Sequence, residues 1–157
     1  MRGPTGCRSL ADDRQRNYVR EGWNITGDTF VEDEDGYFWF QARSDDMIVS
    51  AGYNIAGPEV EAALLSSPDV KECAVIGVPN TDRGQIVEAH VVLAEDVPAD
   101  DVTRLRLQNY VKAVIAPYKY PRSIRFLDEL PKTQTGKIQR FRLRQGAGIC
   151  PATPSKA

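Results

Sequence analysis

The sequence has few of the residues from which metal sites and disulfide frameworks are built. Among its 157 residues there are three cysteines and one histidine. The cysteines, Cys7, Cys73 and Cys150, lie far apart without a CxxC pair. We therefore expect neither a zinc site nor any other metal site, and no disulfide framework. Such sparing use of cysteine is typical of a reducing compartment, and we expect a cytoplasmic protein.

Long hydrophobic runs and a strong charge of either sign are also missing. No stretch approaches the roughly 18 consecutive apolar residues of a membrane span. The opening residues, MRGPTGCRSLADDRQR, contain no apolar core of the signal-peptide kind. The formal net charge of −2 gives no electrostatic reason to expect a nucleic acid as partner. With 41% hydrophobic and 27% charged residues, the composition indicates a globular domain with a real core.

A phosphate-binding P-loop is absent, although the stretch LPKTQTGKIQR is similar to one. A Walker-type loop needs a glycine five residues before its Gly-Lys pair and a serine or threonine after it. Here Pro131 stands in place of that glycine, and Ile138 follows Lys137. A lysine on a Gly/Thr-rich turn can still project into a site and neutralise phosphate charge. Taken alone, Lys137 is better explained as a surface lysine on a loop.

The order of the predicted elements indicates an α+β domain. The turn EDEDG joins two β-prone runs into a hairpin, and Pro58 suits the first position of a helix. Helices are predicted over residues 57–68 and 99–115, and strands over residues 70–79, 85–94 and 122–130. We expect a small mixed or antiparallel three-stranded sheet, flanked by helices and preceded by β-hairpins.

Three other segments carry residues suited to a nucleotide, and each has a plainer explanation. Asp28 follows Thr-Gly and can hold two adjacent hydroxyls, such as a ribose diol, or simply cap a turn. Arg43 offers a planar fork of donors for ribose or phosphate, or belongs to a solvated linker with Asp45 and Asp46. Gly52 interrupts a β-prone run, which indicates either a close backbone approach or a bend.

Taken in order, these segments resemble the acyl-adenylate-forming enzymes. The series TGD, R-x-D-D-x-I, G-x-x-I-x-x-x-E-V-E and P-K-T-x-x-G-K-I-x-R is similar to the C-terminal part of acyl-CoA synthetases, peptide-synthetase adenylation domains and luciferases. The resemblance runs from about Tyr18 to Arg144. The stretches DEDGYFWFQARSDDMIVSAGYNI and IAPYKYPR are most similar to benzoate- or 2-aminobenzoate-CoA ligases and to medium-chain acyl-CoA synthetases. Between these two we favour the aryl-acid ligases.

The resemblance implies a ligase that works in two half-reactions. A carboxylic acid reacts with ATP to give an acyl-adenylate, and then a small domain turns about a hinge so that CoA attacks the adenylate. Mg²⁺ is implied as well, held mainly by a large N-terminal domain that would be the main partner surface. We expect the chain to be a fragment, inactive alone. Residues 1–44 would be a remnant of the large domain, 45–145 the mobile C-terminal domain, and 146–157 a loose tail.

The resemblance also implies a role for each candidate residue. Asp28 and Arg43 would bind the ribose of ATP, Asp45 would be the hinge, and Gly52 would line the channel for the pantetheine arm of CoA. Lys137 would be the catalytic residue, bridging the carboxylate and the α-phosphate in the first half-reaction and leaving the site in the second.

Two positions depart from the family's pattern. Ala42 stands where a glycine is common, which an extended backbone tolerates. Asn54 stands where many relatives have an arginine or lysine, so this position carries no charge here. A second hypothesis is a stand-alone binding module that docks to a carrier or to a separately encoded partner. The coding DNA upstream of Met1 distinguishes the two, because only the ligase hypothesis requires the reading frame to continue into a phosphate loop.

Overall fold

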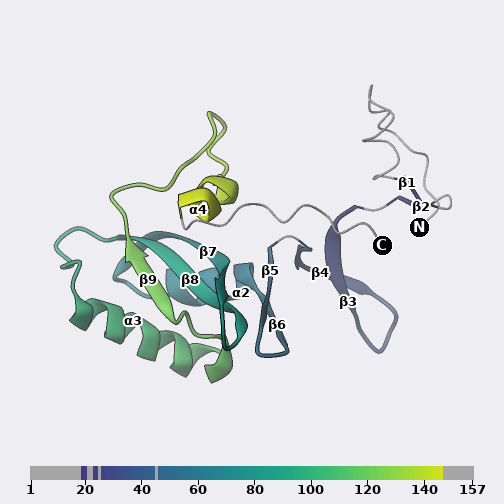
Figure 1. Ribbon diagram of the computed structural model, residues 1–157, viewed down its shortest axis with the longest axis horizontal. Helices are drawn as coiled ribbons and strands as arrows, with labels where there is room; N and C mark the ends of the chain where they lie inside the picture. The colour runs from purple at the N-terminus through teal and green to yellow at the C-terminus, as the bar shows by residue number, and fades with distance from the viewer. Residues whose placement is uncertain (1–18, 21–22, 25, 45, 147–157) are drawn as a thin grey trace. The chain divides into compact units, whose positions relative to one another are not determined.

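The computed structural model describes residues 19–20, 23–24, 26–44 and 46–146 (Figure 1). The chain forms two compact units, which divide between Asp45 and Asp46. Asp45, the predicted hinge, lies outside the described residues, as does nearly all of the predicted tail. The functional domain boundaries expected from the sequence stay predictions.

The first unit is built from two short antiparallel pairs. Strands β1 (Val19–Arg20) and β2 (Trp23–Asn24) form one pair, and β3 (Asp28–Glu32) and β4 (Phe38–Arg43) form the predicted hairpin. The carboxylate of Asp33 organises its turn, accepting hydrogen bonds from the backbone N–H of Asp35 and Tyr37 at 3.1 and 2.9 Å. An aspartate that mimics a backbone acceptor is the usual device for such a turn.

The second unit contains a mixed five-stranded sheet. Its strands are β5 (Met47–Ser50), β6 (Tyr53–Ala56), β7 (Val70–Asn80), β8 (Gly84–Leu93) and β9 (Ser123–Phe126). Strand β8 pairs antiparallel with β7 along its length, and β9 pairs parallel with β8. The predicted α+β class and mixed sheet are confirmed. The sheet has five strands and not three, because the β5–β6 hairpin joins it through a pairing of Ser50 with Gly84.

Three helices and a 3-10 turn complete the second unit: α2 (Gly57–Leu65), α3 (Asp101–Val114), η1 (Pro117–Lys119) and α4 (Arg140–Gly146). Both predicted helices are present. Asp100 caps α3, its side chain accepting a hydrogen bond from the backbone N–H of Thr103 at 2.8 Å. Helix α4 was not predicted, because its short basic segment contains one buried residue, Leu143, and so shows no periodic apolar face.

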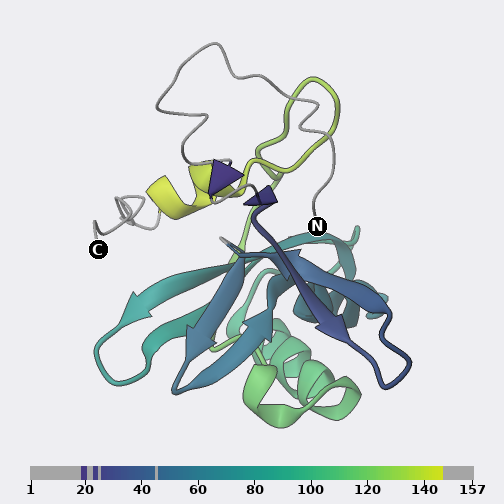
Figure 2. The same ribbon diagram turned by 90° about the vertical axis from the view of Figure 1, so that its right-hand side faces the viewer.

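The sheet carries a separate apolar cluster on each face. On one face, Val87, Ala89 and Val91 of β8 pack with buried residues of α2 and α3. On the other, Ile86 and Val92 belong to a cluster with Leu130 and Leu143 of α4. Figures 1 and 2 show α3 and α4 on opposite sides of the sheet. Alternate residues of β8 therefore pack into different clusters on the two faces of the sheet.

Candidate functional site

Lys137 lies in the long loop between β9 and α4, which is drawn in yellow-green in Figure 1. Its backbone N–H donates to Oγ1 of Thr133 at 3.1 Å, and its carbonyl accepts from the N–H of Thr133 at 2.8 Å. Gly136, with φ of +81°, supplies the left-handed residue that this tight turn requires. The Lys137 side chain is exposed and makes no hydrogen bond or ion pair with any residue that the structure describes. The turn thus presents a fixed main chain and an available ammonium group.

The two ends of the Lys137 loop are joined to each other and to the body of the unit. Lys132 and Ile138 form an isolated antiparallel bridge, and the N–H of Gln139 donates to the carbonyl of Pro131 at 2.7 Å. At the entry to the loop, Nζ of Lys132 lies 2.7 Å from Oε1 of Glu72 on β7. This pair is partly exposed and contributes little, as surface ion pairs do.

At the exit from the loop, a half-buried network of charged side chains joins the chain to the body of the unit. Nη2 of Arg140 lies 2.8 Å from both carboxylate oxygens of Glu61 on α2, and Glu61 also accepts a hydrogen bond from the backbone N–H of Val75 at 2.8 Å. Arg140 and Arg144 both face Asp46, at 3.8 and 2.7 Å. Burial alone would lower the pKa of Arg140, but the hydrogen bonds and charge of Glu61, with Asp46, outweigh burial and raise it. The guanidinium of Arg140 therefore stays charged.

These four network residues were not singled out from the sequence. Glu61 ends the third motif and Arg140 ends the fourth. Their opposite charges at the ends of two motifs could have indicated an ion pair. A separation of 79 residues along the chain, however, gives no local pattern from which the contact could be predicted.

Gly52 occupies the turn between β5 and β6. Ala51 and Gly52 have φ of +50° and +83°, and Ser50 pairs with Tyr53 on either side. Two successive positive φ values are those of a type I′ hairpin turn, which favours glycine. A Cβ added at Gly52 would meet no atom within 4 Å, so turn geometry explains the glycine without any close approach.

Arg83 supports this turn from the neighbouring β7–β8 connection. Its carbonyl accepts a hydrogen bond from the N–H of Ala51 at 2.9 Å, and its Nε donates to Oγ of Ser50 at 3.4 Å. Tyr53, the residue after Gly52, stacks on Tyr118 of η1 with ring centroids 4.5 Å apart. The turn is thereby held against two other parts of the unit while Gly52 itself stays exposed.

Asp28 and Arg43 lie directly opposite each other on β3 and β4. A backbone hydrogen bond joins the TGD motif to the segment that follows Arg43, because the N–H of Ser44 donates to the carbonyl of Gly27 at 2.7 Å. Ala42 lies within β4, so its backbone is extended as its replacement of a glycine requires. The hairpin thus brings the two residues assigned to a ribose to neighbouring positions. Lys137 and Gly52 belong to the other unit.

A buried polar group lies on the α4 side of the sheet. Oε1 of Glu88 lies 3.2 Å from Nε2 of His90 and 3.1 Å from Nε of Arg125, and Oε2 accepts from Oγ of Ser123 at 2.8 Å. Burial raises the pKa of Glu88, but His90, Ser123 and Arg125 together outweigh burial, so the pKa lies below its ordinary value. The carboxylate is charged at neutral pH and fastens β9 to β8. His90 is thus a buried residue of β8 that lies against this carboxylate.

Cys73 is an inert thiol. It is 4% exposed within the core cluster. Burial, followed by the negative charge of Glu61, raises the pKa of the thiol to about 12. A thiol is nucleophilic only as the thiolate, so Cys73 acts as a small core residue.

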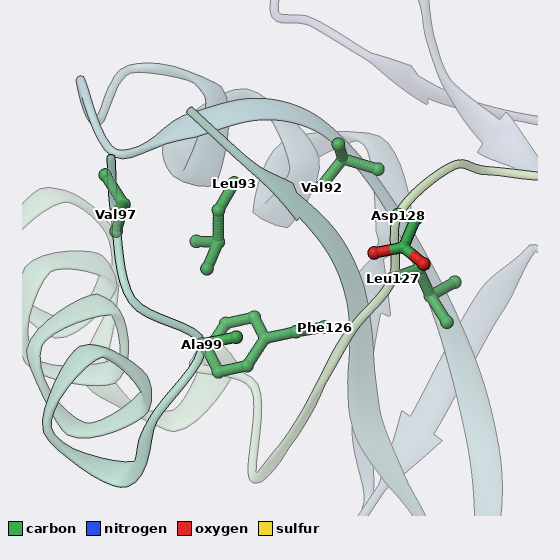
Figure 3. A pocket seen from close by; sticks show the side chains of 7 residues that line it. All are labelled: Val92, Leu93, Val97, Ala99, Phe126, Leu127 and Asp128. Carbon is green, nitrogen blue, oxygen red and sulfur yellow. The ribbon is translucent and has the colours of Figure 1, made fainter. Parts of the chain in front are cut away.

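A pocket of about 350 Å³ opens beside the end of β8 (Figure 3). Six apolar residues and one carboxylate line it: Val92, Leu93, Val97, Ala99, Phe126, Leu127 and Asp128. None of the predicted site residues is among them, so the pocket is not part of the candidate site. Among the described residues, no group of three or more His, Cys, Asp or Glu side chains is arranged to hold a metal. None of the described helices has the length and apolarity needed to cross a membrane.

Comparison with known proteins gives the family. The AMP-binding enzyme C-terminal domain matches residues 59–137, which run from α2 to Lys137 itself. The chain belongs to this family. The resemblance read from the four motifs is confirmed.

Curated relatives that are similar to this chain include acyl-CoA ligases and synthetases. The uncharacterized acyl-CoA ligase YtcI of Bacillus subtilis is 49% identical over 85% of this chain and 25% of its own length. The mitochondrial acyl-coenzyme A synthetase ACSM3 of Mus musculus is 49% identical over 81% of this chain and 22% of its own. The chain therefore spans about a quarter of the length of the curated relatives that it matches.

A solved structure in this family supports the fold. The anthranilate-CoA ligase AuaEII, crystallised with anthranoyl-AMP, matches with a TM-score of 0.76 and 39% identity, over 88% of this chain and 27% of that chain. The fold of this chain is thus similar to a part of a known CoA ligase.

Proposed function

We propose that this chain is the mobile C-terminal domain of an ATP-dependent acid-CoA ligase. The observation that carries the proposal is the presentation of Lys137, whose main chain is bonded to Thr133 and whose side chain is exposed. Membership of the AMP-binding C-terminal family supports it, and so do the names of the relatives, which are acyl-CoA ligases and synthetases.

In the first half-reaction, a carboxylate oxygen attacks the α-phosphorus of ATP, and the bond to pyrophosphate breaks. Negative charge builds on the α-phosphate oxygens as this happens. The ammonium group of Lys137 neutralises that charge, which stabilises the transition state most strongly where water is excluded. A lysine suits this role because its charge is compact and its stem flexible. Pyrophosphate leaves, and the acyl-adenylate remains.

In the second half-reaction, the CoA thiolate sulfur attacks the carbonyl carbon of the adenylate, a thioester bond forms and AMP leaves. The domain turns about Asp45 between the two steps, which withdraws Lys137 and brings the turn of Gly52 to the reacting carbonyl. The exposure of Gly52 and the empty space around it support a position beside the pantetheine arm. A larger side chain there would obstruct the thiol.

Asp28 and Arg43 hold the ribose of ATP in this proposal. Two carboxylate oxygens match the two hydroxyls of the diol, and a guanidinium adds donors beside them. The opposite positions of these residues on β3 and β4 support a shared ligand. Mg²⁺ would offset the charge of the triphosphate, bound mainly by the large domain.

The acid that we propose is an aryl acid such as benzoate or 2-aminobenzoate. The structural likeness to an anthranilate-CoA ligase supports this choice. A medium-chain fatty acid is the alternative, because the same stretches of the sequence are also similar to medium-chain acyl-CoA synthetases. We also propose a cytoplasmic location, because the chain uses few cysteines. The mouse relative, by contrast, is mitochondrial.

The partner surface is the β3–β4 hairpin, which we propose to pack against the large adenylating domain. Phe38 and Trp39 are 64% and 61% exposed, and Phe30 and Phe40 are also exposed. So many exposed aromatic side chains on one hairpin are typical of a covered surface. A stand-alone binding module that docks to a carrier would use the same hairpin without ATP chemistry.

The test is to express the full-length ligase, meaning this chain joined to the large domain of its own reading frame. Benzoate, 2-aminobenzoate, hexanoate and octanoate are each supplied with ATP, and pyrophosphate release is measured before and after CoA is added. We expect one or both aryl acids to release pyrophosphate and to form a CoA thioester. The chain alone, assayed in parallel, is expected to release none.

Two results would overturn the proposal. If the reading frame does not continue upstream of Met1 into a phosphate loop, the chain works as a separate module. If the full-length protein releases no pyrophosphate with any of the four acids, an acid-CoA ligase of this type is excluded. Release with octanoate or hexanoate alone would replace the aryl acid by the medium-chain alternative.

A further inference from the structure

The loop that carries Lys137 is fastened to the domain in two unequal ways. At its entry, the pair of Lys132 with Glu72 is a single contact between side chains that are 38% and 35% exposed. At its exit, the side chains of Arg140 and Glu61 are 24% and 12% exposed. Ion pairs of the second kind are stronger and more selective in direction, because a guanidinium fork and a carboxylate match in a plane. The exit therefore fixes the direction of the loop.

Glu61 is itself fixed to two elements. It lies on α2, and its Oε1 accepts the backbone N–H of Val75 on β7 at 2.8 Å. The same oxygen receives Nη2 of Arg140 at 2.8 Å, and Oε2 receives it at an equal distance. Arg140 thus binds the carboxylate of Glu61, which cannot move without disturbing α2 and the sheet.

The Arg140–Glu61 ion pair lies close to Lys137 along the chain. Two residues, Ile138 and Gln139, lie between Lys137 and Arg140, and an extended chain advances at most about 3.6 Å per residue. The side chain of Lys137 has no partner of its own among the described residues. Its approach to a reacting phosphate therefore depends on the main chain that Arg140 holds.

Arg140 also lies near Asp46, the first residue of the second unit. Nη1 of Arg140 lies 3.8 Å from Oδ2 of Asp46, and Nη2 of Arg144 lies 2.7 Å from Oδ1 of the same carboxylate. Asp46 is the residue that follows the predicted hinge, Asp45. A turn about that hinge would therefore carry the exit of the Lys137 loop with it.

We propose that Arg140 and Glu61 are positioning residues for Lys137, which fix the exit of its loop to α2 and β7 so that the ammonium group reaches the adenylation site in a set orientation. This inference rests on the proposed function. It concerns the first half-reaction alone, because Lys137 has left the site in the second.

The experiment uses the full-length ligase with Arg140→Gln and, separately, Glu61→Gln. Adenylation is followed by pyrophosphate release with ATP and the acid that the wild type accepts, and thioester formation by supplying the acyl-adenylate and CoA. A misplacement of about 1 Å costs on the order of 10²-fold in rate. We expect kcat for adenylation to fall by about that factor with little change in KM for ATP. Thioester formation from supplied adenylate should stay near the wild-type rate.

Two comparisons separate positioning from general stability. Arg106 pairs with Asp69 through Nε and Oδ2 at 2.8 Å, with side chains 50% and 24% exposed. Arg106→Gln therefore removes a more exposed arginine–carboxylate pair that does not touch the loop, and it should leave both half-reactions unchanged. The second is Arg140→Gln made in a Lys137→Ala background. If Arg140 acts through Lys137, it should lower adenylation no further there, since the two changes remove one effect.

Arg140→Lys keeps the positive charge but loses the planar guanidinium, so its adenylation rate should lie between those of Arg140→Gln and the wild type. It also replaces Arg140→Gln in the test if that variant does not fold. Full adenylation in both Arg140 variants would overturn the inference, as would an equal loss in both half-reactions. An undiminished effect of Arg140→Gln in the Lys137→Ala background would overturn it too. In each of these cases the wild-type ligase still adenylates its acid, so the proposed function stands. If the wild type adenylates none, both fall together.

Discussion

Thr133 holds the main chain of Lys137 from both directions. Its Oγ1 accepts the N–H of Lys137 at 3.1 Å, and its own N–H donates to the carbonyl of Lys137 at 2.8 Å. The first bond uses the threonine side chain, so it can be removed by substitution, while the second is a backbone contact that any residue but proline keeps. The consequences of this arrangement can be measured in the full-length ligase.

Thr133→Val is expected to slow adenylation without touching thioester formation. The valine has the same shape but cannot accept the N–H of Lys137, and a lost hydrogen bond of this kind is worth about 1 kcal/mol. That corresponds to a fall of up to about tenfold in the pyrophosphate-release rate. Thr133→Ser, which keeps the hydroxyl, and Thr81→Val on the exposed β7–β8 turn should both retain the rate. An unchanged rate in Thr133→Val would mean that the turn needs only its backbone bonds.

Lys137→Ala is expected to slow adenylation strongly and to spare the second half-reaction. Loss of a charge-stabilising group lowers the rate by about 10²- to 10³-fold. Pyrophosphate release measures the first step, and acyl-CoA formation from supplied acyl-adenylate measures the second. Lys71→Ala, at an exposed position on β7, is the control. An equal loss in both steps would remove the role assigned to Lys137.

Gly52→Leu is expected to do the opposite, lowering thioester formation while adenylation continues. The leucine would occupy the empty space beside the turn, where the thiol is proposed to pass. It must also adopt a φ of +83°, which costs roughly 1–2 kcal/mol for a residue with a Cβ.

The strain at Gly52 needs its own control. Gly36, in the β3–β4 turn, has the same φ of +83°. Gly36→Leu should therefore show a similar loss of thermal stability and a normal second half-reaction. If Gly52→Leu forms the thioester as fast as Gly36→Leu does, Gly52 does not line the route of CoA.

The stability of the chain is expected to fall in acid because of Glu88. Its pKa in the folded state lies below the ordinary 4.5, so its stabilising contribution is complete above that pH. The contribution is lost as the pH falls through the lowered value, because the unfolded state binds the proton first. Urea unfolding between pH 3 and pH 7 should show this loss in the wild type.

Glu88→Gln removes the titrating group. It should cost about 1–3 kcal/mol at pH 7, where it weakens a buried hydrogen-bonded contact, and it should flatten the acid side of the stability curve. Glu72→Gln, in the partly exposed pair with Lys132, should change stability by no more than about 0.5 kcal/mol. An equally steep acid side in Glu88→Gln would assign the loss to other carboxylates.

Much of the fold could be predicted because its signals are local. Pro58 lies in the first turn of α2, which begins at Gly57, and an apolar β-prone run marks β8, so a short window of sequence determines each. The β5–β6 hairpin was recognised only as a β-prone piece broken at Gly52, since its place in the sheet depends on the single pairing of Ser50 with Gly84. Helix α4 was missed because most of its stability comes from tertiary packing of Leu143.

The candidate residues divide in the same way. The types and order of the motif residues determined the family and a list of side chains, because a ribose, a phosphate and a pantetheine arm each restrict the chemistry nearby. Only tertiary structure decided how Lys137 is held, since the carboxylate that fixes its loop comes from a helix 79 residues earlier in the chain. Contacts between distant residues depend on how helices and sheet pack, and no local pattern records them.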